Sequence, residues 1–303
     1  MEPITVREIA EAVGGKLLGA FDDLDRTVTH VFTDSREPDP GALFIPLVGE
    51  RFDGHAFIHD ALTGGAAGCF TQRERESYLP GKFYIKVSST QKALRDLARH
   101  YKQKFKIPFV GVTGSVGKTT TKDMVAAVLG QKYQVLKTEG NFNNELGLPL
   151  SVMKLNGSFR ASVLEMGMSA KGEISYLTGI VRPDIAVITN IGTAHIEFLG
   201  SREAIRDAKL EIAEGLKPGG KLILNGDEPL LSGIPGAVYC ALKNPEAEFR
   251  AANICYTSGG MMFSAVCPDR VIKDCLIPTL GEHTVLDAMF AVACGYYAGI
   301  SDE

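Results

Sequence analysis

The sequence has little of what marks several classes of protein. Its 303 residues carry 32 Lys and Arg against 36 Asp and Glu, a formal net charge of −4, so it has no basic surplus to neutralise nucleic-acid phosphates. Its apolar runs all fall short of the ~18 residues that a membrane-spanning helix needs. Residues Met1–Thr5 lack the cationic start and apolar core of a secretion signal. Nucleic acid and membrane are therefore not expected as partners.

Cysteine is sparse and scattered. None of the six cysteines stands in C-x-x-C spacing, which argues against a zinc ribbon and a thioredoxin-like pair. We interpret them as buried thiols in a reducing compartment, and we expect a cytoplasmic protein. The six are Cys69, Cys240, Cys255, Cys267, Cys275 and Cys294.

The length predicts two domains. In residues 1–84, short strand-like and helix-like stretches alternate, which favours a small α/β domain. Thr5–Glu8 is a capping box that opens a helix ending at Gly14. A second capping box, Ser88–Gln91, opens a helix that reaches Phe105. We predict that this helix begins the second domain, residues 85–303.

The second domain has the pattern of a doubly wound α/β fold with a mostly parallel sheet. Its strands are short, continuous apolar runs separated by helical stretches, as buried parallel strands with crossover helices are. The runs are 109–112, 161–164, 185–188 and 221–224.

The C-terminal third of the sequence is less regular. Residues 245–278 suggest antiparallel strands around a turn at 257–260, and a helix from about 283 to 297 is apolar almost all round, so it is expected to pack on several sides. Ser301–Glu303 resembles the start of a further helix. We therefore expect more chain beyond these residues.

The most informative motif is a glycine-rich turn between an apolar strand and a helix. Such a turn directs backbone N–H groups at phosphate oxygens, while the lysine reaches the β/γ-phosphates and the following threonine hydroxyl binds Mg²⁺. The common pattern has glycine where this chain has Val112. The alternative is a glycine-rich turn followed by Lys-Thr by chance. We predict an ATP site formed by Thr113, Gly114, Ser115, Val116, Gly117, Lys118, Thr119 and Thr120.

Three polar residues follow neighbouring strands, where α/β sheets place ligands. Glu165 ends the strand 161–164, His195 follows the strand 185–188, and Lys209 lies in the next helix. Taken singly, each has a plain structural explanation, as a helix cap, a loop histidine and a solvated helix residue.

The loop 138–149 is rich in asparagine and glycine. It includes Asn141, Asn143 and Asn144, whose amides suit a polar or phosphate-bearing ligand. The alternative is a loop that is merely rich in turns.

The motifs occur in an order that resembles the Mur ligases, the ATP-dependent amide-forming enzymes of peptidoglycan synthesis. Within that family, the double asparagine and the Glu-Met-Gly favour the branch that adds D-Ala-D-Ala over MurE-type relatives. The resemblance covers residue 28 to the end. The matching segments are Asp34–Arg36, Pro40–Phe44, Asp53–His55, Thr113–Thr119, Gly140–Asn144, Glu165–Gly167, Asn190–His195 and Ala208–Lys209.

The resemblance implies an ATP-dependent ligase that joins D-Ala-D-Ala to a UDP-MurNAc-tripeptide through an acyl phosphate. The first domain would hold the UDP end of the precursor.

The resemblance also implies roles for single residues. Ser35 and Arg36 would bind the precursor, with Asn141 and Asn144 as further substrate-binding residues. Thr119 and Glu165 would bind one Mg²⁺ and His195 a second, and Lys209 would carry a carbamate that also serves as a metal ligand. Lys118, His195 and Lys209 would be the catalytic residues.

Two departures from the family pattern bear on these expectations. The usual His-Asn-x-x-Asn is His283-Thr284-x-x-Asp287 here, so Asp287 would accept from the adenine amino group in place of an asparagine. No counterpart of the family's third domain follows, so we expect the 303-residue chain by itself to be a monomer that binds nucleotide but ligates poorly. The alternatives are a MurE-type or folylpolyglutamate-type ligase and a non-catalytic nucleotide-binding module.

Overall fold

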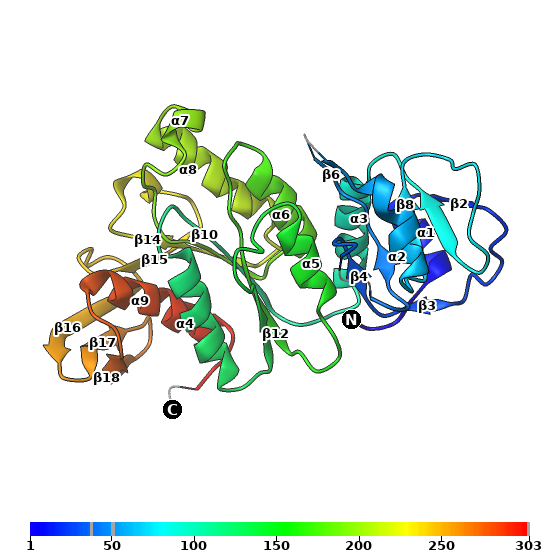
Figure 1. Cartoon of the computed structure of the whole chain (residues 1–303). Helices are drawn as coiled ribbons and strands as arrows, with labels where there is room; N and C mark the ends of the chain where they lie inside the picture. The colour runs from blue at the N-terminus through cyan, green and yellow to red at the C-terminus, as the bar shows by residue number, and fades with distance from the viewer. Residues whose placement is uncertain (37–38, 50–51, 302–303) are drawn as a thin grey trace. The chain divides into compact units, whose positions relative to one another are not determined.

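The chain folds into two compact units in the computed structural model, which describes residues 1–36, 39–49 and 52–301 (Figure 1). The first unit comprises residues 1–105 and 149–157, and the second comprises 106–148 and the chain from Ser158 onward. Asp302 and Glu303, where the sequence predicts the start of a further helix, lie outside the described residues.

The first unit is a small α/β fold around a five-stranded sheet in the order β2-β9-β8-β5-β4, in which only β2 runs antiparallel to its neighbour. Thr5 caps α1 through its side chain, and Gly14 ends that helix in the left-handed conformation, as predicted. The elements are β1 (Ile4–Thr5), α1 (Val6–Val13), β2 (Lys16–Leu18), β3 (Thr27–Val28), β4 (Val31–Phe32), β5 (Leu43–Phe44), β6 (Val48–Gly49), β7 (Phe52–Asp53), η1 (Gly54–Phe57), α2 (Ile58–Thr63), β8 (Gly68–Thr71), β9 (Phe83–Lys86) and α3 (Thr90–Lys102).

The position of α3 differs from the prediction in two ways. Its N-cap is Ser89, whose side chain accepts from the Lys92 amide, because Ser88 lies one residue too early to reach that N–H. The helix also belongs to the first unit, so the division falls after Phe105 and not after residue 84. The reason is packing: the Tyr101 side chain is fully buried and its hydroxyl donates to the Leu155 carbonyl, which lies in the segment 149–157 of the same unit.

The second unit is the expected α/β fold with a mostly parallel sheet. The helix α5 (Gly147–Met153) lies mostly in the segment 149–157 of the first unit. In chain order the elements of the second unit are β10 (Phe109–Thr113), α4 (Lys118–Gly130), β11 (Val135–Lys137), β12 (Ala161–Glu165), α6 (Glu173–Val181), β13 (Ile185–Ile188), α7 (Ile196–Leu199), α8 (Arg202–Leu210), η2 (Glu211–Gly215), β14 (Lys221–Asn225), η3 (Pro229–Leu231), β15 (Val238–Ala241), β16 (Phe249–Thr257), β17 (Gly260–Val266), β18 (Val271–Ile277) and α9 (Glu282–Tyr297).

The strand order is β11-β12-β10-β13-β14-β15-β16-β17-β18. The strands from β11 to β16 are parallel, and β16–β18 form the predicted antiparallel extension. The chain moves from β10 outward to β11, returns through β12, and then crosses to the other side of β10. The carboxyl ends of β12, β10 and β13 therefore border the point where the strand order reverses, where α/β folds bind ligands.

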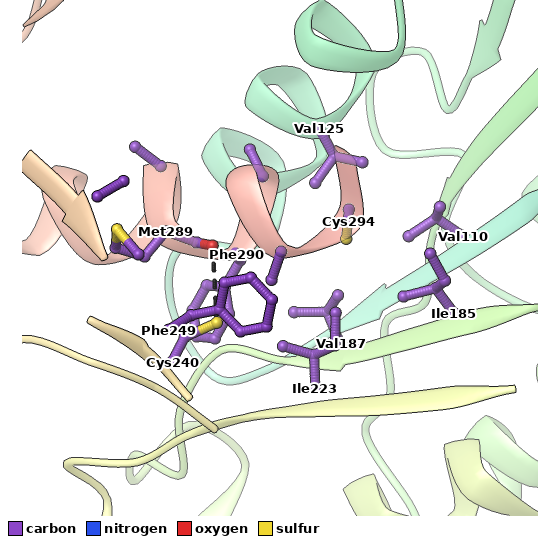
Figure 2. Packing of buried hydrophobic residues seen from close by; sticks show 14 of the residues in the cluster. Val110, Val125, Ile185, Val187, Ile223, Cys240, Phe249, Met289, Phe290 and Cys294 are labelled. Carbon is purple, nitrogen blue, oxygen red and sulfur yellow. Dashed lines mark hydrogen bonds between the residues drawn. The ribbon is translucent and has the colours of Figure 1, made fainter. Parts of the chain in front are cut away.

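The core of this unit lies between the sheet and the helix pair α4 and α9. Figure 2 shows the strand residues Val187 and Ile223 on the side of the sheet that α9 covers, with Val125 of α4 near Cys294 of α9. The α9 helix is buried over most of its circumference, as its apolar sequence predicts. On the other face, a Cβ at Gly111 would approach Ile212 of η2, so that face is covered as well. Within the described residues, no helix is long and apolar enough to cross a membrane.

Candidate active site

The glycine-rich turn joins the end of β10 to the start of α4. Gly117 caps the helix with φ of 83°, a conformation that favours glycine, and a Cβ at Gly114 would lie 1.9 Å from the Thr189 Oγ1 atom. Val112, where the common pattern has glycine, is a fully buried strand residue in register with Glu165 and Val187. An apolar residue suits that position, because the turn begins only after the strand ends.

The turn is held in place by the residues that follow β13. The Asn190 Oδ1 atom accepts from the Ser115 and Val116 amides at 3.1 and 2.9 Å, and the Ser115 hydroxyl accepts from the Gly192 amide at 2.8 Å. Two backbone N–H groups of the turn are thus already paired. The first-turn N–H groups of α4, which have no partner within a helix, remain to face an anion.

A carboxylate at the end of β12 contacts the first turn of α4. The Thr119 hydroxyl donates to Glu165 at 2.8 Å, and the Asn143 amide donates to the other carboxylate oxygen, also at 2.8 Å. The Glu165 side chain is only 2% exposed. This pair of oxygen ligands is of the kind that Mg²⁺ prefers beside phosphates.

A cavity of about 270 Å³ opens beside the turn. The predicted catalytic residues Lys118, His195 and Lys209 all line it, although they come from three different elements. His195 has φ of 65°, which is uncommon for a residue with a side chain. The described residues that line it are Gly114, Ser115, Lys118, Asn143, Asn144, Gly167, Met168, Ser169, Glu173, Ala194, His195 and Lys209.

Lys209 is buried, with 2% of its surface exposed. Desolvation by burial, followed by the charge of Lys118, lowers the pKa of Lys209 to about 7. A substantial fraction of its amine is therefore uncharged near neutral pH. A solvated helix lysine, the plain alternative from the sequence, does not describe this residue.

The four predicted metal ligands fall into two pairs. Thr119 and Glu165 touch each other, whereas His195 and Lys209 share the cavity lining. Within residues 1–36, 39–49 and 52–301, no group of three or more His, Cys, Asp or Glu side chains could hold a metal ion by itself. The Thr119–Glu165 pair fits Mg²⁺, which usually binds to one or two protein oxygens and completes its shell with phosphates and water. His195 and Lys209 present nitrogen atoms, so their part in a second metal site stays a prediction.

Several predicted binding residues lie away from the cavity lining. Thr113 is buried and donates to the Met166 carbonyl, and Thr120 and Asn141 are exposed. Asn144 does line the cavity, but its Oδ1 atom accepts from the amides of Leu146 and Gly147 at the start of α5.

Asp287 lies against the back of the glycine-rich turn. Its Oδ1 atom accepts from the Thr121 hydroxyl at 2.7 Å and lies 2.9 Å from where a Cβ of Gly117 would stand. Burial raises the pKa of Asp287 to about 6, and the hydrogen bond from Thr121 acts in the opposite direction. Its contact with adenine stays a prediction.

Two residues that position this site were not predicted individually. Asn143 orients Glu165, and Asn190 orients the glycine-rich turn. Both stand inside segments that the sequence already singles out. The strand order would have distinguished them from the other asparagines of these segments. Each one forms a hydrogen bond with a residue at or after the end of a neighbouring strand, β12 for Asn143 and β10 for Asn190.

The first unit has a separate cavity of about 450 Å³ around the predicted residues Ser35 and Arg36. Phe52 and Phe57 stack at its wall, with ring centroids 5.6 Å apart, and Phe52 is 51% exposed. The Arg36 guanidinium pairs with Asp34 at 2.5 Å, and this bond holds the pKa of Asp34 at about 2. The cavity offers flat apolar surface beside a cation.

Comparison with known proteins identifies the class. The sequence matches the Mur ligase middle domain over residues 112–295 and the Mur ligase family catalytic domain over residues 27–102. The chain therefore belongs to the Mur ligase family.

Several relatives carry the name of one ligase. The chain is 46% identical to the UDP-N-acetylmuramoyl-tripeptide–D-alanyl-D-alanine ligase of Bacillus subtilis (strain 168), with 99% of this chain and 65% of that protein aligned. It is similar to the structure of MurF from Acinetobacter baumannii, with a TM-score of 0.89, 29% identity and coverage of 99% of this chain and 66% of that one.

It is also similar to MurF ligase from Thermotoga maritima in complex with ADP, with a TM-score of 0.80, 31% identity and coverage of 90% and 64%. The chain thus spans about two thirds of the length of the relatives it matches.

Proposed function

We propose that this protein is an ATP-dependent ligase that joins D-Ala-D-Ala to the terminal carboxylate of a UDP-MurNAc-tripeptide. The observation that carries the proposal is a single cavity lined by Lys118 of the glycine-rich turn, by His195 and by the buried Lys209. The relatives that bear this name at 46% and lower identity support it.

Amide formation from a carboxylate needs a leaving group better than hydroxide. The substrate carboxylate would attack the γ-phosphate of ATP, releasing ADP and leaving an acyl phosphate. The amine of the dipeptide then displaces inorganic phosphate. Both reacting groups of the first step are anions, so catalysis consists mainly of positioning and of offsetting charge repulsion.

The chain's own groups suit that task. Lys118 and the first-turn N–H groups of α4 bind the phosphates, and Asn190 keeps the turn in shape. Thr119 and Glu165 would hold one Mg²⁺, and His195 with Lys209 a second. Bound there, the ions would supply positive charge to the triphosphate.

Lys209 suits modification by CO₂. With a pKa of about 7, its amine is partly uncharged at neutral pH. The nitrogen can therefore form a bond to the carbon of CO₂ and release a proton, which leaves a negatively charged carbamate. Such a group replaces a buried cation by an anion beside Lys118, which also removes a repulsion between the two lysines.

The first unit would bind the UDP end of the precursor. Its exposed Phe52 and Phe57 offer a stacking surface for the uracil ring, and Arg36 offers a cation for the diphosphate.

The test is product analysis with the complete gene product. UDP-MurNAc-tripeptide, D-Ala-D-Ala and MgATP should yield one amide product, one ADP and one phosphate per turnover, read by mass spectrometry and a phosphate assay. A single amino acid offered in place of the dipeptide, with the UDP-dipeptide as acceptor, tests the MurE-type alternative. Nucleotide binding without product from either pair would favour a non-catalytic module and refute the proposal.

A further inference from the structure

Three of the residues that line the cavity beside the glycine-rich turn carry groups that attract anions. Lys118 and Lys209 contribute amines, and His195 contributes an imidazole. Among the described residues that line it, Glu173 supplies the only carboxylate. A carboxylate at the wall of this cavity is suited to bind a positively charged group of a substrate.

Glu173 is held at the cavity wall by the structure around the start of α6. One of its carboxylate oxygens, Oε2, accepts from the Ser169 amide at 2.6 Å. The neighbouring Glu211 accepts from the Gly172 and Ser175 amides, which fixes the backbone on either side of Glu173. The position of Glu173 is therefore set by contacts that do not use its Oε1 atom.

Three carboxylates on neighbouring segments, those of Glu165, Glu211 and Glu214, are engaged elsewhere. Both oxygens of Glu165 accept hydrogen bonds, from Thr119 and Asn143. Glu211 is buried and satisfies backbone amides. Glu214 is exposed and accepts from the Ser175 hydroxyl.

We propose that Glu173 binds the ammonium group of the incoming dipeptide and so sets the position of the nucleophile. This inference rests on the proposed function, which requires two anionic partners and one cationic substrate in the same site. Lys118 and Lys209 are opposite in charge to the acceptor carboxylate and the ATP phosphates. Glu173 is opposite in charge to the ammonium group of the dipeptide.

The test compares two nucleophiles in the complete gene product. Glu173→Gln keeps an oxygen that can accept from Ser169 and removes the charge. The matched control is Glu214→Gln, which changes an exposed carboxylate of η2 that contacts Ser175 of α6 and lies outside the cavity lining. D-Ala-D-Ala enters as an ammonium ion, whereas hydroxylamine, which traps acyl phosphates, is uncharged near neutral pH.

In Glu173→Gln, the KM for D-Ala-D-Ala should rise at least about tenfold, equivalent to 1.4 kcal/mol. Hydroxylamine trapping and the KM for ATP should both stay within about twofold of wild type. Glu214→Gln should change none of the three.

Three results would overturn the inference while leaving the proposed function intact: an unchanged dipeptide KM, an equal loss with both nucleophiles, or a raised Mg²⁺ requirement at unchanged dipeptide KM. If the wild-type protein forms no amide at all, the proposed function fails and this inference fails with it.

Discussion

The two cavities that the sequence points to are built in opposite ways. In the second unit, the site is assembled from segments that are distant in sequence and joined by partly buried hydrogen bonds such as Thr119–Glu165 and Ser115–Asn190. In the first unit, the Arg36 side chain is 86% exposed, and its ion pair with Asp34 joins two residues that are close in sequence. The first kind of site is preorganised, and the second depends on local sequence.

This difference predicts separable effects. Substitutions at the strand ends should alter ATP-dependent steps and leave affinity for UDP unchanged, whereas substitutions at the stacked rings should do the reverse. A variant that disturbed both equally would break the comparison.

The largest effect is expected at Lys209. Lys209→Ala removes the buried amine and with it the proposed carbamate, and turnover should fall on the order of 100-fold, about 2.7 kcal/mol, while ATP affinity changes little. Steady-state kinetics of the complete gene product measure this. Short carboxylates should restore part of the activity.

The matched control is Lys171→Ala, an exposed lysine in the loop before α6. A ¹³C NMR signal of a carbamate should be present in wild type with labelled bicarbonate, and should grow as pH rises through about 7, where the amine loses its proton. An unmodified Lys209 at pH 8 under CO₂ would contradict this assignment.

The next effect concerns the shape of the glycine-rich turn. Asn190→Ala leaves the Ser115 and Val116 side of the turn without its side-chain acceptor, so MgATP affinity should fall about tenfold. Calorimetric titration of MgATP measures this affinity, and Asn253→Ala in the antiparallel extension is the control. Equal affinity in both variants would show that the turn keeps its shape without Asn190.

A third effect is on stability and depends on pH. The folded pKa of Asp287 is about 6, above its ordinary value of 3.8, so its ionisation opposes folding. The cost is absent below pH 4, grows up to about pH 6 and is full above it. Asp287→Asn keeps an acceptor for Thr121 and should raise the free energy of unfolding by about 2 kcal/mol above pH 6, with no change below pH 4.

Denaturant unfolding across that range tests this prediction. The control is Asp274→Asn at an exposed position that asparagine also tolerates, since its φ is 54°. Its unfolding curve should stay parallel to that of the wild type at every pH. If Asp287→Asn raised the free energy of unfolding equally at pH 3.5 and pH 8, the ionisation of Asp287 would be excluded as the cause of the gain.

The smallest effect is expected in the first unit. Phe52→Ala removes one exposed ring of the stacked pair and should weaken UDP binding about fivefold, near 1 kcal/mol, without altering MgATP affinity. Titration of each ligand into each variant measures both. A loss of ATP affinity in Phe52→Ala would mean that the two cavities are energetically coupled.

Local patterns were sufficient for the elements and for the nucleotide motif. The capping of α1 by Thr5 and Gly14, the parallel strands and the long apolar α9 all follow from short-range chemistry. The polar residues after β12 and β13 could be named because parallel strands present their carboxyl ends at one edge.

What the sequence could not supply depends on contacts between distant segments. Assigning α3 to the first unit requires knowing that Tyr101 meets Leu155. Choosing Asn143 and Asn190 over Asn141 requires the order of the strands, since one asparagine serves Glu165 and the other serves the glycine-rich turn. The environment of Lys209 is likewise a property of packing and not of helical spacing.

The central claim is that the turn before α4 is an ATP site in which Lys118 contacts the phosphates. Calorimetric titration of MgATP into the 303-residue chain and into Lys118→Ala tests it most directly. The account predicts one site in the wild type and at least about tenfold weaker binding, 1.4 kcal/mol, in the variant. Equal affinity of the two proteins for MgATP would contradict it.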